Sequence, residues 1–408
     1  MTQDPPPGVT GRHVTMSPRQ YNQERLLGAL RVRGTATRAD LAGATGLSRA
    51  TVAATVAKLL AAGLMRELPP ADRRSGPGRP AGSLCLVAAP GVVAGLDFGH
   101  SHLRAAVADL SGQVLAEEHR DLQVDNSPDD ALAAAAYEFR RLLDRISTGV
   151  SDVTGVVVGL PSPIDRGTGR VVSNNILPGW VNRAPAHELQ ERIRLPVVLD
   201  NYANLAALGE ITYGSAKGVR NLIYVKASIG IGTGLVFEGR LYRGDTGTAG
   251  ELGHVQIQPD GAICRCGNRG CLETLVSVPH VLATLQPMHR EQLTIADVVR
   301  LATTGDVSAR RVVTDAGRAI GRTLADLCNV LNPGALIIGG ELAAAGAPFT
   351  AGIREAIDHH TQPVIADAVA IRTSALGERA EVLGNRAGRP DQLAARNLVH
   401  RSALRLRS

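Results

Sequence analysis

Two kinds of hydrophobic pattern divide this chain. Up to about residue 66, apolar side chains recur at helical spacing, first over Arg25–Leu30 and again from Arg49 onwards. From Val92 onwards, short apolar runs typical of strands alternate with longer helical stretches. The pattern therefore predicts a small helical domain at the N-terminus and a larger α/β domain after it.

The N-terminal part has the signals of a helix-turn-helix. A second helix opens at Thr37, which can form a capping box with Asp40. It ends before Gly46, which supplies the positive φ of a tight turn. Ser48 can then cap a third helix that runs from Arg49 to about Ala62. Helix pairs of this kind also occur as plain packing units, so the pattern alone leaves a structural role open.

The third helix is expected to enter the major groove of DNA with its polar N-terminal part. Its buried stripe comprises Val52, Val56, Leu59 and Leu60, which leaves the opposite face exposed. The candidate contacts with bases or phosphates are Arg38, Ser48, Arg49, Thr51 and Thr55.

A basic hairpin is expected to follow as a wing. One strand begins at Gly63–Arg66, a Gly/Pro-rich turn occupies residues 73–80, and Ser83–Leu86 returns as the second strand. Arg79 in this turn is a further candidate DNA contact, suited to a narrow minor groove. A flexible linker is the alternative. These signals assign residues 1–20 to a disordered tail and residues 21–88 to a winged helix-turn-helix.

The α/β part is assigned to residues 91–383. A helix over Ala316–Leu331 precedes its last strand, and Ser111-Gly112 closes a hairpin. The predicted strands are Val92–Gly99, Leu103–Asp109, Gly155–Leu160, Pro196–Asp200, Asn221–Val225 and Ala335–Gly340.

Composition and charge are those of a folded, DNA-binding protein. A hydrophobic content of 44% with 20% charged residues excludes global disorder, and 408 residues suffice for two or three domains. The net charge is +6, and residues 1–82 hold twelve Arg and Lys against five Asp and Glu. Clustered positive charge suits phosphate binding, although a solvated basic face or a coding bias towards arginine is the alternative.

No apolar run reaches the roughly 18 residues of a membrane span, and no signal peptide is evident. We therefore expect a cytoplasmic, nucleoid-associated protein without a membrane partner.

Three of the five cysteines lie in one eight-residue loop, with a histidine ten residues before the first of them. Such a set provides the four nitrogen and sulfur ligands of a closed tetrahedral Zn²⁺ site. Because every ligand comes from protein, the metal is expected to order residues 254–273 rather than activate water. Unligated surface thiols would gain nothing from this clustering. The candidate ligands are His254, Cys264, Cys266 and Cys271, and the remaining Cys85 and Cys328 are expected in the core.

Four segments of the body carry a family resemblance. They are Asp97-x-Gly99, Asp200-Asn201 before Ala203-Asn204, Glu251–His254, and Cys264-x-Cys266-Gly-x-x-Gly-Cys271-x-Glu273. They resemble the ROK family of repressors and sugar kinases, and the resemblance covers residues 21 to about 383. The winged helix is similar to that of the repressor branch, which includes xylose- and N-acetylglucosamine-responsive regulators. The resemblance implies an actin-like ATPase fold with a sugar between two lobes and zinc bracing the nearby loop.

The resemblance also implies which residues bind the sugar. Carboxylates accept and amides donate hydrogen bonds at the fixed angles that hydroxyls require. His254 can bind zinc through one ring nitrogen while the other faces the ligand. Trp180 lies in the same region and is expected to be a core aromatic. The implied ligands are Ser162, Asn174, Asn201, Glu251, His254 and Glu273.

Three departures from the family's kinases argue against catalysis. Tyr202 stands where the kinases have the general-base Asp, and a phenol with a pKa near 10 is no base at neutral pH. His100 replaces a glycine of the first phosphate loop, and Ile229 replaces a threonine of the second. ATP is therefore not expected as a cofactor. An active ATP-dependent sugar kinase with a DNA-binding head is the alternative.

The sequence thus predicts a sugar-responsive DNA-binding transcriptional regulator. A repressor of carbohydrate uptake or catabolism genes, released by a sugar inducer, is the favoured form. Its partners would be double-stranded operator DNA, a sugar and further copies of itself in a homodimer or homotetramer. A regulatory protein partner in place of the sugar remains open.

The C-terminus departs from the family pattern. Gly388 and Pro390 break a helix, and four arginines between Arg396 and Arg407 make the end basic. This predicts weakened packing of the last helix on the first lobe. It also predicts a tail over residues 384–408 that is disordered or, less favoured, adds nonspecific DNA contact.

Overall fold

The computed structural model describes residues 18–61, 65–68, 82–86, 91–109, 113–172 and 175–387. The candidate residues Arg79 and Asn174, the wing turn and the tail after residue 387 lie outside the described ranges. The chain forms two compact units, and the boundary between head and body falls between Gly91 and Val92. Within the described residues, no helix is both long and apolar enough to cross a membrane.

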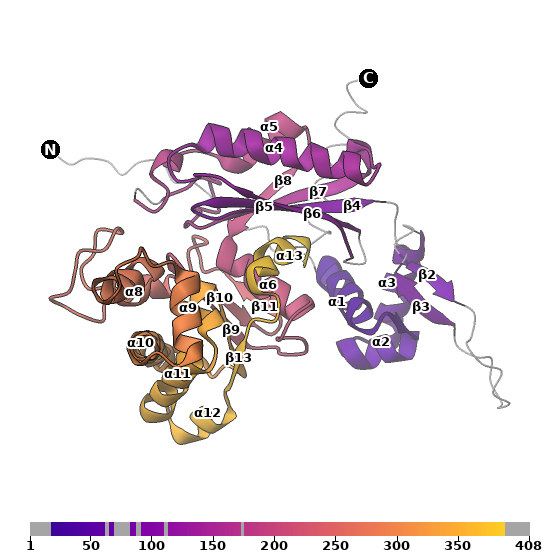
Figure 1. Ribbon diagram of the computed structural model, residues 1–408. Helices are drawn as coiled ribbons and strands as arrows, with labels where there is room; N and C mark the ends of the chain where they lie inside the picture. Colours follow the sequence, from indigo (N-terminus) through magenta and orange to yellow (C-terminus); the bar gives the residue numbers. More distant parts are fainter. Residues whose placement is uncertain are drawn as a thin grey trace, which may run out of the picture. The chain divides into compact units, whose positions relative to one another are not determined.

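In its described residues, the head contains three helices and a small antiparallel sheet (Figure 1). Its helices are α1 (Pro18–Arg33), α2 (Arg38–Thr45) and α3 (Arg49–Ala61), and its strands, in the order β1-β3-β2, are β1 (Thr35–Ala36), β2 (Met65–Leu68) and β3 (Ser83–Leu86). The buried stripe of α3 packs with Leu26, Leu30 and Leu41 into one core. These elements confirm the winged helix-turn-helix. Helix α1 begins inside the segment 1–20 that we had assigned to a disordered tail, so that boundary was placed too late.

The predicted helix caps are present in the head. The Asp40 N–H donates to Thr37 Oγ1 (3.2 Å), and the Thr37 N–H donates to Asp40 Oδ2 (2.9 Å). The hydrogen bonds that the Thr37 N–H and the Thr37 hydroxyl (2.7 Å) donate to the Asp40 carboxylate lower the pKa of Asp40. Gly46 has φ +64° and ends α2 in the left-handed conformation that glycine adopts without steric cost. Short-range chemistry therefore fixes the turn before the third helix.

The first lobe of the body is built on a five-stranded sheet in the order β6-β5-β4-β7-β8. Strands β4, β7 and β8 are parallel, and β5 and β6 form an antiparallel hairpin. Helices α4 (Pro128–Arg145) and α5 (Pro185–Ile193) cover one face (Figure 1). The strands are β4 (Val92–Phe98), β5 (His102–Asp109), β6 (Val114–Asp121), β7 (Val153–Leu160) and β8 (Val197–Asn201).

The second lobe has its own mixed sheet, in the order β11-β10-β9-β12-β13. Its strands are β9 (Leu222–Ala227), β10 (Ile231–Phe237), β11 (Arg240–Tyr242), β12 (Ala335–Gly339) and β13 (Ala370–Thr373). The sequence analysis missed β10, β11 and β13. The helices of this lobe are α7 (Glu273–Val276), α8 (Val278–Leu285), α9 (Ile295–Thr304), α10 (Val307–Leu331), α11 (Ala347–His360) and α12 (Pro363–Ala368).

Helix α13 (Ala380–Ala387) packs closely against α6 (Tyr202–Thr212) and against β4 and β7. An added Cβ at Gly384 would lie 1.6 Å from the Leu205 carbonyl oxygen, and one at Gly209 would lie 2.3 Å from that of Ala380. Glycine therefore lets the two backbones touch. The prediction that the last helix packs weakly on the first lobe was wrong, and the ordered body extends past residue 383. Gly384 is a packing residue rather than the start of a tail, and Gly388 lies outside the described residues.

Candidate functional site

The exposed N-terminal part of α3 carries the candidate DNA contacts. Ser48 Oγ accepts a hydrogen bond from the Thr51 N–H (3.1 Å) and lies 2.8 Å from Thr51 Oγ1. Thr55 Oγ1 donates to the Thr51 carbonyl (2.7 Å). These three hydroxyls therefore also hold the first turns of the helix together. Arg49 is exposed, and no described residue pairs with its guanidinium.

Arg38 has a protein partner. Its Nη1 lies 2.7 Å from Glu67 Oε1 on β2, and both side chains are half exposed. The ion pair lowers the pKa of Glu67 through the hydrogen bond from Arg38. Glu67 thus neutralises part of the Arg38 charge. Arg49 has no such partner among the described residues, so its full charge is available to a DNA phosphate.

The same face of α3 exposes a group of small apolar side chains that the sequence analysis overlooked. Their methyl groups are of the kind that contacts the thymine methyl in the major groove. The signal was available, because these positions lie opposite the buried stripe on a 3.6-residue period. The residues are Ala50, Ala53, Ala54 and Ala57, followed by Lys58.

The body brings the four predicted metal ligands together. One ligand atom from each of His254, Cys264, Cys266 and Cys271 lies within 4.8 Å of all the others. Cys264 Sγ is 3.6 Å from His254 Nδ1, and Cys266 Sγ is 3.7 Å from Cys271 Sγ. The group can therefore hold a metal ion through one nitrogen and three sulfurs.

Backbone contacts position this cysteine loop, which we define as residues 261–271. The Cys264 N–H donates to the Asn268 carbonyl (2.7 Å), and Gln256 pairs with Cys271 across an isolated bridge. Gly270 has φ +65°, and a Cβ there would lie 1.5 Å from the Gln258 carbonyl oxygen. Only glycine fits this position. It lets the backbone at residue 270 lie directly against the backbone of Gln258.

The ionisation of the four ligands suits a metal cation. Burial, together with the neighbouring thiols Cys266 and Cys264, raises the pKa of Cys271 to about 12. Burial also raises the pKa of Cys264 and lowers that of His254. Without a cation these shifts favour the protonated thiols of Cys264 and Cys271 and the neutral imidazole of His254. A bound metal ion would supply the positive charge that thiolates need.

Two acidic residues flank this group. Glu251 Oε2 lies 3.7 Å from His254 Nε2, which leaves Nδ1 for the metal. Burial, and then the Glu273 carboxylate, raise the pKa of Glu251 to about 7. Glu273 is buried and accepts hydrogen bonds from the Ile231 N–H (3.0 Å) and Arg265 Nε (2.9 Å). Its carboxylate is therefore held in one fixed orientation.

The other candidate sugar ligands lie on the first lobe. Ser162 is buried just after β7, and Asn201 ends β8. Asn201 Nδ2 donates to the Ser162 carbonyl (3.3 Å), and its Oδ1 accepts the Ala203 N–H that opens α6 (2.8 Å). The structure thus forms two groups: Ser162 with Asn201, and Glu251 with His254 and Glu273.

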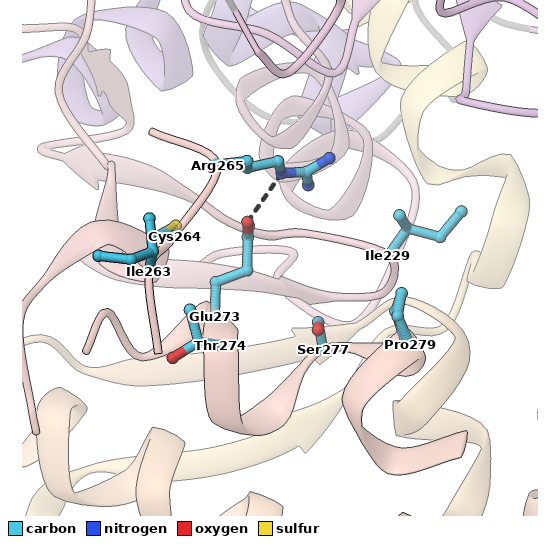
Figure 2. Close-up of a pocket in the computed structure, with 8 residues that line it drawn as sticks. All are labelled: Ile229, Ile263, Cys264, Arg265, Glu273, Thr274, Ser277 and Pro279. Carbon is cyan, nitrogen blue, oxygen red and sulfur yellow. Dashed lines mark hydrogen bonds and ion pairs between the residues drawn. The ribbon is translucent and has the colours of Figure 1, made fainter. Parts of the chain in front are cut away.

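A cavity of about 220 Å³ lies beside the cysteine loop (Figure 2). Glu273 is the one candidate sugar ligand among its lining residues. Its walls are Ile229, Ile263–Arg265, Glu273, Thr274, Ser277 and Pro279. It is therefore a space on the second lobe that adjoins the predicted sugar site.

An ion pair that the sequence analysis missed joins the two sheets of the body near Asn201. Arg243, just after β11, donates from Nε to Asp200 Oδ2 on β8 (2.9 Å). Asp200 Oδ1 also accepts from Asn204 Nδ2 (2.9 Å). Forty-three residues separate the pair in the chain, so no local pattern could have indicated it.

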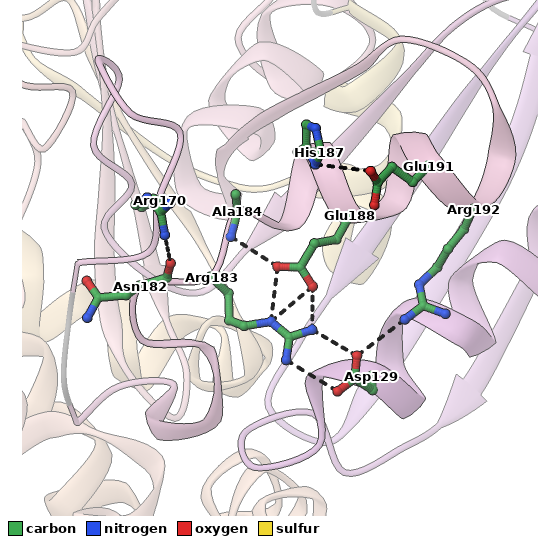
Figure 3. A network of polar contacts seen from close by, with 9 residues as sticks. All are labelled: Asp129, Arg170, Asn182, Arg183, Ala184, His187, Glu188, Glu191 and Arg192. Carbon is green, nitrogen blue, oxygen red and sulfur yellow. Dashed lines mark hydrogen bonds and ion pairs between the residues drawn. The ribbon is translucent and has the colours of Figure 1, made fainter.

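The segment that leads from Ser162 to α5 is braced by a charged network (Figure 3). Arg183 pairs with both Glu188 and Asp129, and Arg192 also reaches Asp129 (3.3 Å). The hydrogen bond from Arg183 lowers the pKa of Glu188. Trp180 in this segment is fully buried and donates from Nε1 to the Val124 carbonyl (2.7 Å). It is a core aromatic, as predicted.

Tyr202 is buried at the start of α6, at the position where the family resemblance places the general base of the kinases. Burial raises the pKa of Tyr202 to about 12, so its phenol stays protonated at neutral pH. Lys226 Nζ lies 4.3 Å from the centre of the ring and pairs with Glu381. The neighbouring carboxylate of Asp200 is already bound by Arg243.

Side chains of the chain itself contact the two glycine-containing loops that the sequence analysis compared with the phosphate loops of the kinases. His100 Nδ1 lies 2.8 Å from Asp125 Oδ1, and the ring of His102 lies over Gly99, 2.2 Å from where a Cβ would be. Ser228 Oγ donates to Glu341 Oε2 (2.6 Å), which ties the second loop to the turn after β12. The sequence analysis had not singled out His102 or Glu341.

Comparison with known families assigns both parts of the chain. The ROK family matches residues 93–388, and a family described as winged helix-turn-helix DNA-binding matches residues 19–64. The first match covers most of the body and the second covers the three helices of the head.

Individual relatives fall into two groups. A xylose repressor of Bacillus spizizenii is 29% identical over 366 residues, covering 90% of this chain and 94% of its own length. A glucokinase of Halalkalibacterium halodurans is 30% identical over 309 residues, covering 71% of this chain and 92% of its own. A crystal structure of a ROK family transcriptional regulator, a homologue of E. coli Mlc, has a TM-score of 0.76 at 28% identity, over 92% of this chain and 96% of that one. The two regulators thus match nearly the whole chain, and the kinase matches little more than the body.

Proposed function

Since this chain belongs to the ROK family and carries a winged helix-turn-helix head, we propose that it is a DNA-binding transcriptional repressor whose body senses a sugar. The observation that supports the proposal is that one chain holds both the winged helix-turn-helix head and the ROK body. The xylose repressor of Bacillus spizizenii matches 90% of this chain. Ser162, Asn201, Glu251, His254 and Glu273 are the proposed sugar ligands, together with Asn174.

Sugar binding would act by changing the relation between two heads in a homodimer or homotetramer. A two-fold dimer reads half-sites roughly 34–36 Å apart, or a multiple of that distance. A ligand that prefers the arrangement unable to bind the operator lowers operator affinity by the ratio of its affinities for the two states. Candidate sugar ligands lie on both lobes, so closure of the body around the sugar would supply that preference.

The proposed metal is zinc, held by His254, Cys264, Cys266 and Cys271. One imidazole nitrogen and three thiolates form the closed ligand set of structural zinc sites. Zinc would supply the charge that keeps the three thiols ionised, and thereby hold the cysteine loop against Glu273 and Arg265. The chain's own residues then orient the sugar.

We further propose that the body has no useful kinase activity. Neither wild type nor the Tyr202→Asp variant is expected to release ADP with hexoses, because restoring a base leaves His102 over Gly99 and Glu341 on Ser228. A coupled assay over a hexose panel, with a ROK glucokinase as positive control, measures this. General-base catalysis is worth roughly 10² to 10⁴-fold. A rise of that size in the Tyr202→Asp variant would show that the phosphate loops still work.

Replacing Arg49 with alanine is expected to weaken operator binding by about 1–3 kcal/mol, or roughly 5- to 150-fold. Arg49 is exposed at the start of α3 and pairs with no described residue, so its loss would remove a proposed direct contact with DNA. Selection from a random duplex pool first yields the operator, and fluorescence anisotropy then measures affinity at several salt concentrations. Arg290→Ala, at an exposed position of the body, is the matched control. Equal affinity of the Arg49→Ala variant and wild type would contradict the assignment of α3 as the reading helix.

A further inference from the structure

The candidate sugar ligands form two groups, and one loop of the second lobe lies between them. We name this loop, residues 243–250, the bridging loop; it follows β11 directly. Its first residue, Arg243, pairs with Asp200, which directly precedes the candidate ligand Asn201. The residue after the loop is the candidate ligand Glu251. The loop therefore connects a contact beside one group with a member of the other.

Arg243 holds the Asp200 carboxylate through two hydrogen bonds. Its Nε (2.9 Å) and its Nη2 (2.5 Å) both donate to Asp200 Oδ2. The side chains of Arg243 and Asp200 are 26% and 13% exposed, so water competes with this ion pair less than with a pair on the open surface. Two donors on one rigid guanidinium restrict a carboxylate more than a single charge does. Arg243 therefore fixes the orientation of a carboxylate on the other lobe.

Asp200 in turn holds the backbone of Asn201. Its Oδ1 accepts hydrogen bonds from the Asn201 N–H (2.8 Å) and from Asn204 Nδ2 (2.9 Å). The Asn201 side chain accepts the Ala203 N–H and donates to the Ser162 carbonyl. A side-chain amide can accept two hydrogen bonds and donate two. These contacts with described residues use one of each, which leaves one acceptor site and one N–H of Asn201 for a ligand.

The bridging loop also contacts the segment that follows Ser162. The Arg166 N–H donates to the Thr246 carbonyl (3.0 Å). Gly247 has φ +100°, and an added Cβ there would lie 2.4 Å from Arg166 Cγ and 3.1 Å from the Ile164 carbonyl oxygen. Glycine at this position therefore lets the loop lie against the first lobe.

The far end of the bridging loop is bound to the second lobe. Thr233 on β10 donates to the Gly250 carbonyl from both its N–H (3.1 Å) and its hydroxyl (2.6 Å). The Ala249 N–H donates to the Arg243 carbonyl (3.1 Å), which closes the loop on itself. Hydrogen bonds thus hold the bridging loop on both lobes, between the two groups of candidate ligands.

We propose that Arg243 is a positioning residue of the sugar site. Through Asp200 it orients the Asn201 amide, and the bridging loop keeps this amide in register with Glu251, so that one sugar can bind both. The proposal rests on the proposed function, since it concerns the site at which the sugar would bind. Arg243 contacts Asp200 rather than the sugar, so its loss lowers sugar affinity through Asn201.

The test measures sugar affinity in the full-length, zinc-loaded protein. Calorimetry with D-xylose, D-glucose, D-mannose, D-galactose and N-acetyl-D-glucosamine identifies the sugar that wild type binds. Arg243→Gln is expected to weaken binding of that sugar about tenfold, which corresponds to the loss of one or two hydrogen bonds from a neutral amide. Arg243→Lys should lose less, because a positive charge remains beside Asp200 without the two donors of the guanidinium.

The matched control is an arginine in another ion pair of the body. Arg104→Gln breaks a pair with Glu117 between β5 and β6, at the end of the first-lobe sheet opposite β8. This variant should bind the sugar as wild type does. Melting temperature and zinc content check the folding of every variant.

A second background separates positioning from stability. Asn201→Ser keeps a side-chain oxygen that can cap α6 and removes the amide. In this background, Arg243→Gln is expected to cost less than about twofold in affinity, because the group that Arg243 orients is gone. Destabilisation alone would weaken binding equally in both backgrounds.

A double variant keeps the test informative if Arg243→Gln folds poorly. Asp200→Asn with Arg243→Gln removes both charges, so no carboxylate is left without its partner. This variant should melt close to wild type, yet bind the sugar about as weakly as expected for Arg243→Gln.

The outcomes separate the two proposals. Equal sugar affinity of wild type, Arg243→Gln and the double variant would overturn the positioning role and leave the sensor function standing. A tenfold loss that persists in the Asn201→Ser background would also overturn it, because Arg243 would then act by another route. If none of the sugars binds wild type, the sensor function and the positioning role fall together.

Discussion

Replacing Cys271 with serine is expected to abolish stoichiometric zinc binding and to lower the free energy of unfolding of the body by about 3 kcal/mol or more. Structural zinc contributes about 10–16 kcal/mol in small zinc domains, and part of that is the energy that orders the ligand loop. Cys271 is fully buried, and its sulfur lies next to that of Cys266. Three remaining ligands cannot close a tetrahedral site.

The matched control is Cys328→Ser. Cys328 is also fully buried, and burial raises the pKa of its thiol to about 11, but it lies on α10 away from the cysteine loop. Elemental analysis of both variants measures zinc per chain, and chelator titration followed by thermal melting measures its contribution to stability. We expect one zinc in wild type and in the control and none in Cys271→Ser. Full zinc occupancy of the Cys271→Ser variant would contradict the assignment.

Loss of zinc is also expected to disrupt the cavity beside the cysteine loop. Cys264 and Arg265 are neighbours in the chain, and both line the cavity. A loop that loses its metal no longer holds Arg265 against Glu273. Effector binding is therefore expected to disappear in Cys271→Ser even if the rest of the body stays folded.

Replacing Glu381 with alanine is expected to destabilise the body by about 3–5 kcal/mol, because it leaves the buried ammonium of Lys226 without a partner. The side chains of Lys226 and Glu381 are 11% and 3% exposed. Burial opposes the charge on Lys226, but Glu381 and Asp97 outweigh it and raise its pKa. The lysine is therefore charged in the wild type. Without Glu381, burial works against this charge, and the variant bears the cost either of an unpaired ammonium or of removing its proton.

Two further variants make the test specific. The double variant Lys226→Met with Glu381→Leu removes both charges and should recover most of the lost stability. Glu378→Ala, three residues away, removes an exposed carboxylate that pairs with Arg104 and should cost no more than about 1 kcal/mol. Denaturant titration followed through Trp180, the single tryptophan, reports on the first lobe, on which α13 packs. Equal destabilisation by Glu378→Ala and Glu381→Ala would contradict a central role for the pair.

Interactions between residues close together in the sequence made part of this structure predictable. The capping box of Thr37 and Asp40 and the turn at Gly46 act within a few residues, so the head followed from the sequence. The metal ligands also fall within residues 254–271, and a short Gly-rich loop has few ways to separate them. Cysteine spacing was therefore enough to find this group.

Contacts between residues far apart in the sequence could not be predicted from the sequence alone. Lys226 and Glu381 are 155 residues apart, and Asp200 and Arg243 are brought together only when two sheets meet. Strand β10 was missed because Gly232 and Gly234 weaken its strand pattern. An added Cβ at Gly234 would lie 2.6 Å from the Ala203 carbonyl oxygen on α6, so glycine is needed there for packing. Gly384 was misread for the same reason.

Operator affinity with and without the effector tests the central claim most directly. The full-length protein is titrated onto its selected operator in the absence of ligand and at a saturating concentration of the sugar that binds it. We predict that the ligand weakens operator binding at least about tenfold, and that operator DNA weakens ligand binding by the same factor, as linkage requires. A ligand that binds the body but leaves operator affinity unchanged would contradict the account.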